Sequence, residues 1–196
     1  LLTIKDKIFS MNIRALENTS QALNLQELER AVDAIKKAGQ IHFYGLGASG
    51  IVAADGEQKF SRIGLRANAF NDGHMQITRA ALLQPGDVAV GVSYSGETMD
   101  IRSAVKTAKE AGATTIAITN FVHSPLVKEA DILLQISSEE NIFRSGAISS
   151  RIAQLSTLDA LFMAVALRNL TTTQTCLERT YGALGRVYQR STVLTG

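Results

Sequence analysis

The chain has 196 residues, of which 45% are hydrophobic and 19% charged, and its formal net charge is only +2. These values predict a folded domain with a substantial core, and the scattered basic residues give no support for nucleic-acid binding by this segment. The single Cys176 excludes an internal disulfide. The three histidines, His42, His74 and His123, are too dispersed to suggest a metal site.

No apolar run approaches the roughly 20 residues that are needed to cross a bilayer, and the N-terminus lacks the basic and apolar regions of a signal peptide. We therefore expect a cytoplasmic protein without membrane contact. The chain does not begin with Met and opens directly in a helical pattern. This beginning indicates a longer protein that has been cut at a linker.

Residues 1–38 predict two amphipathic helices, the second of which ends at Gly39. The apolar residues that define their faces are Ile4, Ile8, Met11, Ile13 and Leu16 in the first helix and Leu25, Leu28, Val32 and Ile35 in the second.

From residue 39 onward, short β-rich runs alternate with helical patterns. The predicted strands are Ile41–Tyr44, Arg66–Phe70, Val88–Val92, Thr114–Thr119 and Ile132–Ile136. The predicted helices between them cover about 49–63, 75–83 and 98–111, with a short helix near Pro125. The strands are almost continuously apolar, which indicates a parallel sheet that is covered on both faces. We predict an α/β fold: a three-layer sandwich with a five-stranded, doubly wound sheet of the flavodoxin-like type, flanked by N- and C-terminal helices.

After the sheet, Ser137–Ser150 is a polar stretch that is too long for a simple turn. A strongly apolar helix is predicted from Ser150 to about Leu170, and such a helix is expected to be buried, often at a subunit interface. A last helix is predicted from about Gln174 to Gln189.

Two of the predicted strands run into short Gly/Ser loops that lead into helices. The first loop is Gly45-Leu-Gly-Ala-Ser-Gly50 and the second is Ser93-Tyr-Ser-Gly-Glu-Thr98. Helix N-termini present unpaired N–H groups and a positive dipole end, and glycine lets an oxyanion approach the backbone. Neither loop contains Lys or Arg, so a phosphate would be held by hydrogen bonds. At neighbouring strand ends, the two loops predict one cradle for a small phosphorylated metabolite.

The two loops also allow other interpretations. Gly45-x-Gly47-x-x-Gly50 matches the dinucleotide fingerprint, with Asp72 where an acidic ribose ligand is expected, but the hydroxyl-rich second loop argues against this. The second loop is not a nucleophile elbow, because Ser95 stands where glycine is required, and no Walker lysine follows. It stays open that Gly and Ser only form turns and helix caps.

Together the two loops resemble the SIS (sugar isomerase) domain, in which they close on the phosphate of a phosphosugar. Four further segments resemble the SIS effector domain of RpiR-type bacterial transcriptional regulators: Lys59-Phe-Ser-Arg-Ile-Gly64, Asp72-Gly-His74, Glu140-Asn-Ile-Phe-Arg-Ser-Gly146 and Ser150-Arg-Ile-Ala-Gln-Leu155. The resemblance runs from about residue 40 to 170. It implies a regulatory domain behind an N-terminal helix-turn-helix DNA-binding domain that is absent from this chain, with the opening helix as the linker.

The resemblance also implies the residues of the site. Those assigned to the phosphate are Gly47, Ala48, Ser49, Ser93, Tyr94, Ser95, Gly96, Glu97 and Thr98, through the Ser and Thr hydroxyls and the amides of residues 94, 96 and 97. Beyond what the resemblance implies, we predict that His74, Glu140 and Arg144 contact the sugar. No metal, cofactor or catalytic residue is expected.

Isomerisation or ether cleavage would need a general base. The candidates are Glu97, Glu139, Glu140, His74 and His123. However, Glu97 at a helix start would complement the dipole, and His123 fits a surface loop. His74 could either reach the site or simply start a helix. Arg144 and Arg151 could contact the sugar or pair with Glu139 or Glu140.

We therefore expect a non-enzymatic sensor of a sugar phosphate, divided into flanking helices (1–38), the SIS domain (39–170) and a C-terminal helix (171–196). Homodimers or higher homo-oligomers are expected, and DNA would be bound only through the absent domain. Ligand binding could then reorient the DNA-binding modules. The alternatives are a phosphosugar isomerase or lyase with the same cradle and a purely structural dimerisation module. The loops distinguish neither the sugar nor activation from repression.

Overall fold

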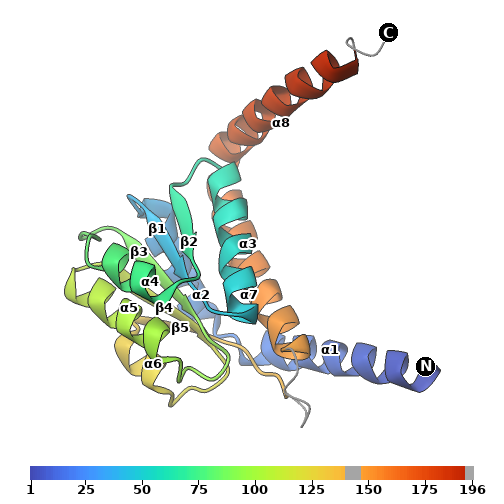
Figure 1. Ribbon diagram of the computed structural model, residues 1–196, viewed down its shortest axis with the longest axis vertical. Coiled ribbons are helices and arrows are strands. Elements are labelled where there is room, and N and C mark those ends of the chain that lie inside the picture. Colours follow the sequence, from blue (N-terminus) through green and yellow to red (C-terminus); the bar gives the residue numbers. More distant parts are fainter. Residues whose placement is uncertain (140–146, 193–196) are drawn as a thin grey trace.

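A computed structural model describes residues 1–139 and 147–192, with side chains up to residue 185. The sheet has five parallel strands in the order β2-β1-β3-β4-β5 (Figure 1). The strands are β1 (Ile41–Tyr44), β2 (Ala67–Phe70), β3 (Val88–Val92), β4 (Thr114–Thr119) and β5 (Ile132–Gln135). This order confirms the predicted doubly wound, flavodoxin-like sheet, and the predicted strand ends are right to within one residue.

Helices cover both faces of the sheet and form the predicted three-layer sandwich (Figure 1). One layer consists of α2 (Leu25–Lys37), α3 (Ala48–Arg62) and α7 (Ile148–Leu167). The opposite layer consists of α4 (Gly73–Ala80), α5 (Met99–Glu110) and α6 (Pro125–Glu129).

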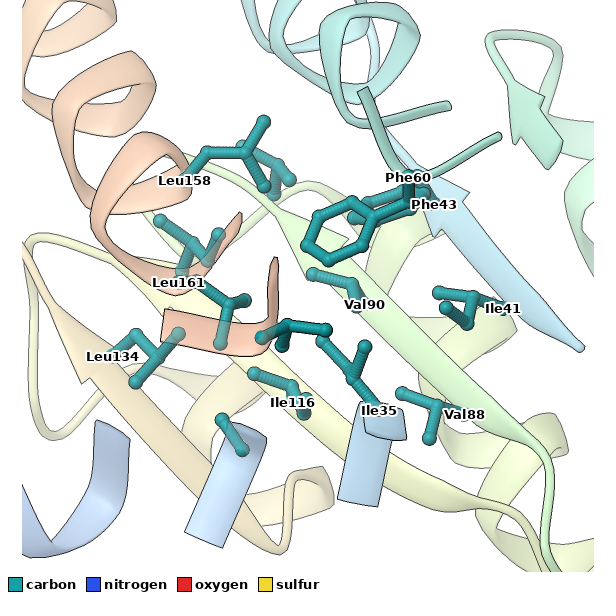
Figure 2. Packing of buried hydrophobic residues seen from close by; sticks show 14 of the residues in the cluster. Ile35, Ile41, Phe43, Phe60, Val88, Val90, Ile116, Leu134, Leu158 and Leu161 are labelled. Atoms are coloured by element: carbon teal, nitrogen blue, oxygen red, sulfur yellow. The ribbon is translucent and has the colours of Figure 1, made fainter. Parts of the chain in front are cut away.

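The larger core lies between the sheet and the layer of α2, α3 and α7. Leu158 and Leu161 of α7 and Phe60 of α3 point toward Val90 and Ile116 of the central strands (Figure 2). All five of these side chains are buried. Because the central strands are apolar on both faces, packing fixes α3 and α7 firmly on the sheet.

Two helices project from this sandwich, α1 (Leu2–Ala22) and α8 (Leu170–Thr192) (Figure 1). The C-terminal half of α1 is docked through the buried Ala15 and Thr19. The apolar side of α1 is covered only in part, since Ile8, Met11 and Leu16 are half-buried whereas Ile4 and Ile13 are exposed. The apolar periodicity thus predicted the helix correctly.

The helix α7 corrects another expectation. By length and composition it could cross a bilayer, although no such run was expected from the sequence. In the described structure 44% of this stretch is buried, and Leu158, Leu161 and Val165 belong to the core. Packing against the sheet accounts for its apolar composition.

Candidate phosphate-binding site

The two Gly/Ser loops lie side by side at the carboxyl edge of the sheet. The first follows β1 and the second follows β3, and these strands are hydrogen-bonded neighbours in which Tyr44 is paired with Gly91. The chain passes from β1 to β2 on one side of β1 and then from β2 to β3 on the other side, so the loops after β1 and β3 flank the point where the strand order reverses. Ligands of open α/β sheets bind in the crevice at this point. We call the loops Gly45–Gly50 and Ser93–Thr98 together the cradle.

The first loop is compact because its glycine leaves room for the turn. A Cβ atom on Gly45 would lie 2.3 Å from the carbonyl oxygen of Ser49, so only glycine fits there. The helix α3 begins at Ala48 after Gly47, which has no side chain to cap the first amides. No side chain caps this helix start, and the amides of Ser49 and Gly50 donate to the carbonyl oxygens of Leu46 at 3.1 Å and Gly47 at 3.0 Å. The first turn of α3 thus brings the half-buried Ser49 to the edge of the crevice.

Two buried glutamines hold this first loop. The Nε2 atom of Gln76, from α4, donates to the carbonyl oxygens of Gly45 at 3.2 Å and Phe70 at 2.8 Å. The side-chain amide of Gln154, from α7, lies against the Oγ atom of Ser49, with Nε2 at 3.3 Å and Oε1 at 3.4 Å. The exposed fractions of Gln76 and Gln154 are 0% and 1%. The position of the loop thus depends on contacts with two distant helices.

Neither glutamine was assigned to the site from the sequence. A signal for Gln154 was nevertheless present, because Ser150, Gln154 and Thr157 follow one another at helical spacing within the apolar α7. All three are buried in the structure. Most buried polar side chains have hydrogen-bond partners, and the partner of Gln154 belongs to the cradle.

The second loop is closed by its own serines. Ser93 Oγ accepts a hydrogen bond from the Gly96 N–H at 3.1 Å and lies 3.2 Å from Thr98 Oγ1. Ser95 Oγ accepts a hydrogen bond from the Glu97 N–H at 3.2 Å. The amides of Gly96 and Glu97, which were predicted as phosphate donors, are thus paired with serine oxygens. A phosphate would have to replace the serines as their acceptor.

The side chain of Tyr94 leads away from the loop. Its hydroxyl donates to the carbonyl oxygen of Ser138 at 3.2 Å, and its ring meets Phe121 edge to face at 5.6 Å between centroids. The N–H of Ser138 donates in turn to Asn120 Oδ1 at 2.8 Å. The side chain of Tyr94 therefore anchors the second loop to the ends of β4 and β5. Only the backbone amide of Tyr94 is left for the predicted contact with the phosphate.

The residues predicted to contact the sugar are only partly placed. His74 is exposed in the first turn of α4. A Cβ atom on the neighbouring Gly73 would lie 2.6 Å from Asp100 Cγ, so this turn packs against the start of α5 beside the second loop. Asp72 caps α4, because its carboxylate accepts the Met75 N–H at 2.9 Å, which gives it a structural role. Glu140 and Arg144 lie outside the described residues.

Exposed positions hold the remaining acid and base candidates. Glu97, Glu139 and His123 are all exposed, and Arg151 is half-buried at the start of α7. Within residues 1–139 and 147–192, no group of three His, Cys, Asp or Glu side chains could hold a metal ion.

A buried polar pair lies on the strand below the first loop. His42 Nδ1 is 3.2 Å from the hydroxyl oxygen of Tyr44, and both side chains are buried in the layer next to α4. Burial, and secondly the positive charge of Arg79, lowers the pKa of His42 to about 4. Burial also raises the pKa of Tyr44 above its usual range. Both groups are therefore neutral near pH 7, and the pair is part of the scaffold.

Two cavities lie elsewhere on the surface. One of about 540 Å³ is formed by the end of α3 and by α8, next to Gly64 and Cys176. The other, of about 750 Å³, runs along α1 and reaches Glu139. Neither is lined by cradle residues. We assign the site by strand-end geometry and by the concentration of hydrogen-bonding groups, because phosphates bind to such loops rather than to large cavities.

Comparison with known proteins places this geometry in a family. Residues 34–164 match the model of the SIS domain. An uncharacterized HTH-type transcriptional regulator of Caldanaerobacter subterraneus is 48% identical over 180 residues, which cover 92% of this chain and 64% of that protein. The HTH-type transcriptional regulator RpiR of Escherichia coli K12 is 38% identical over 167 residues, which cover 85% and 56% of the two chains. The chain thus spans about three fifths of the length of these relatives.

Among solved structures, the NanR protein of Vibrio vulnificus, complexed with ManNAc-6P, superposes with a TM-score of 0.87 at 26% identity. The superposition covers 93% of this chain and 69% of NanR. These similarities confirm the resemblance to RpiR-type regulators. Both cradle loops lie within the matched segment 34–164, and the chain belongs to the SIS domain family.

Proposed function

We propose that this chain is the effector domain of an RpiR-type transcriptional regulator and that it binds a sugar phosphate in the cradle without converting it. The observation that carries the proposal is the juxtaposition of two hydroxyl-rich loops at the ends of the adjacent strands β1 and β3, each at the start of a helix. Such an arrangement favours a bound anion.

The relatives support this assignment. The curated proteins described above are HTH-type transcriptional regulators, and NanR was solved with ManNAc-6P. Because this chain spans 64% and 56% of those two regulators, we propose that the full-length protein carries a DNA-binding domain before α1. In that arrangement α1 is the connection between the sensor and the DNA-binding domain.

The cradle would hold the phosphate with neutral donors. The proposed donors are the hydroxyls of Ser49, Ser93, Ser95 and Thr98 and the backbone amides of Tyr94, Gly96 and Glu97. Hydrogen bonds to a charged group contribute about 1.5–3 kcal/mol each, so four or five of them suit a metabolite-level affinity after the cost of ordering. Because serines already occupy the Gly96 and Glu97 amides, binding exchanges internal bonds for ligand bonds.

The exposure of the possible bases favours binding over catalysis. A general base is usually tuned by burial or by a close charge, and Glu97, His74 and His123 are all exposed. The regulator relatives point the same way.

We also propose that the chain forms a homodimer through α7 and α8. Apolar side chains on the outer face of α7 and along α8 are exposed, among them Met163, Leu167, Leu170 and Leu184. A projecting helix with such a face gains stability when a partner covers it. A second copy of the chain offers the same face, as a symmetric interface requires.

A thermal-shift and calorimetry series tests the proposed ligand class. The chain is titrated with ManNAc-6P, with hexose and pentose phosphates, and with inorganic phosphate. A ligand at 100 times its Kd should add about 2.7 kcal/mol to the free energy of unfolding. Ser95→Ala should weaken the shift, whereas Ser20→Ala, on the exposed side of α1, should not. If no sugar phosphate shifts the transition, or if NMR shows that a bound one is converted, the proposal is wrong.

A further inference from the structure

We infer that Gln154 is a positioning residue for ligand binding, because its side-chain amide decides whether the Ser49 hydroxyl can donate to a phosphate. This inference rests on the proposed phosphate site and deepens it. Gln154 lies on α7, 105 positions away from Ser49, and it is fully buried behind the cradle. It would act on the ligand only through Ser49.

The geometry leaves both orientations of the amide open to Ser49. The Oγ atom lies 3.3 Å from Nε2 and 3.4 Å from Oε1 of Gln154, so the amide can either donate to the hydroxyl or accept from it. Ser49 itself is half-buried, in the first turn of α3. Its hydroxyl therefore stands between a buried amide and the crevice.

The direction of this hydrogen bond has a chemical consequence. A serine hydroxyl has one proton and two lone pairs, and an ionised phosphate oxygen only accepts. If Gln154 donates through Nε2, the Ser49 proton is free for the phosphate. If Gln154 accepts through Oε1, the proton is withheld and only lone pairs face the ligand. Glutamine suits both the empty and the occupied site, whereas a carboxylate in its place could only accept.

The surroundings of Gln154 make the effect local. Lys59 of α3 forms ion pairs with Asp55, on the same helix at 2.6 Å, and with Asp159 of α7. The buried Phe60 and Leu158 lie in the same core between these helices. This clamp joins α3 and α7 independently of Gln154, so a change at position 154 alters mainly the hydrogen bonding of Ser49.

Gln154→Glu and Gln154→Met test the inference, with ManNAc-6P and inorganic phosphate as probes in calorimetry. Gln154→Met removes the amide without adding a charge, and we expect a loss of affinity of a few fold. Gln154→Glu should bind at least about tenfold more weakly than wild type at pH 7.5, since the carboxylate withholds the Ser49 proton and repels the anion. The ratio of the Kd of Gln154→Glu to the Kd of wild type should be smaller at pH 5.5 than at pH 7.5, because a protonated Glu can donate a hydrogen bond to Ser49. Equal affinities of the two variants at both pH values would overturn the inference.

A double-mutant cycle covers the case in which Gln154→Glu fails to fold. Ser49→Ala combined with Gln154→Met should bind as weakly as Ser49→Ala alone, because Gln154 acts through the Ser49 hydroxyl. Fully additive losses would overturn the inference while leaving the proposed function intact. If wild type binds neither these probes nor the other sugar phosphates, both the inference and the proposed function are wrong.

Discussion

Thr19 and Ser137 exchange two hydrogen bonds across 118 positions of the chain. The N–H of Ser137 donates to Thr19 Oγ1 at 3.0 Å, and the Thr19 hydroxyl donates to the Ser137 carbonyl oxygen at 3.2 Å. The next residue, Ser138, accepts the hydroxyl of Tyr94 from the second cradle loop at 3.2 Å. The cradle and α1 are thus joined through two adjacent residues at the end of β5.

We expect Thr19→Val to loosen the docking of α1. The exposed fraction of Thr19 is 4%, and the variant leaves the Ser137 N–H without its acceptor at nearly unchanged volume. The loss of the acceptor for a buried donor costs about 1–3 kcal/mol, and because Ser137 is only half-buried we expect the free energy of unfolding to fall by about 1 kcal/mol. Denaturant unfolding measures the total loss, and amide hydrogen exchange should show faster exchange in the second half of α1.

The matched control for this variant is Thr175→Val. The Thr175 hydroxyl also bonds to a backbone carbonyl, that of Thr171, but it is exposed on α8. We expect Thr175→Val to change the free energy of unfolding by less than about 0.5 kcal/mol. Unchanged exchange rates along α1 in Thr19→Val would show that the Thr19–Ser137 bonds do not hold this helix.

Gly96→Ala should disrupt the second cradle loop. Gly96 has a φ of +65°, and an added Cβ would lie 2.1 Å from Ser124 Oγ and 2.4 Å from Ser124 Cβ. The strain of the backbone alone is of order 1–2 kcal/mol, and the clash forces the loop to move. We expect lower thermal stability and a loss of sugar-phosphate binding in calorimetry.

Gly86→Ala separates the effect of backbone strain from the effect of the clash in the second cradle loop. Gly86 also has a positive φ, +93°, but nothing lies within 4 Å of an added Cβ, and it precedes β3 at the opposite end from the cradle. This variant should lose stability through backbone strain and still bind the ligand. If Gly96→Ala binds as well as Gly86→Ala, the conformation of the second loop does not matter for recognition.

The sequence predicted the sheet well because local signals mark its strands. The ends of β1 and β3 could be placed because apolar runs stop at glycine or polar residues, as at Gly45, Asp87 and Ser93. The loops after β1 and β3 could be predicted as the cradle, since glycine and serine at the start of a helix favour the binding of an anion. The alternation of strands and helices, together with the rule of right-handed crossovers, predicted a doubly wound parallel sheet, and the structure gives its order as β2-β1-β3-β4-β5.

What the sequence could not predict depends on contacts between distant segments. Periodicity identified α1 as a helix but could not say that Ile4 and Ile13 would face away from the core. Gln154 and Gln76 meet the cradle only after α7 and α4 have packed against the sheet. The pairing of the Gly96 amide with Ser93 likewise depends on the detailed conformation of the loop.

Charged substitutions on the outer face of α7 should weaken the proposed homodimer. The exposed fraction is 62% for Leu167 and 50% for Met163. Burial of each side chain against a partner would stabilise the dimer by up to about 1.5–3 kcal/mol. In sedimentation velocity, Met163→Asp with Leu167→Asp should shift the chain from dimer to monomer. Leu82→Asp, equally exposed at 63% beyond α4, should leave the dimer intact. A monomeric wild type would contradict the proposed interface.

The buried His42 should make stability depend on pH. Its pKa is about 4 in the folded chain and about 6.5 when unfolded, so the unfolded state binds more protons between these values. The free energy of unfolding should therefore be highest above pH 6.5, fall as the pH drops toward 4, and level off below. The loss from this one residue is about 3 kcal/mol.

His42→Gln removes the titrating group and keeps a polar partner for the Tyr44 hydroxyl. Denaturant unfolding between pH 4 and 7 should give a shallower pH dependence for this variant than for wild type, by up to about 1.4 kcal/mol per pH unit. His123→Gln, on an exposed turn, should reproduce the wild-type slope. Parallel curves for wild type and His42→Gln would mean that His42 takes up its proton in the folded chain as easily as in water, and that the layer below the first cradle loop opens to solvent in acid.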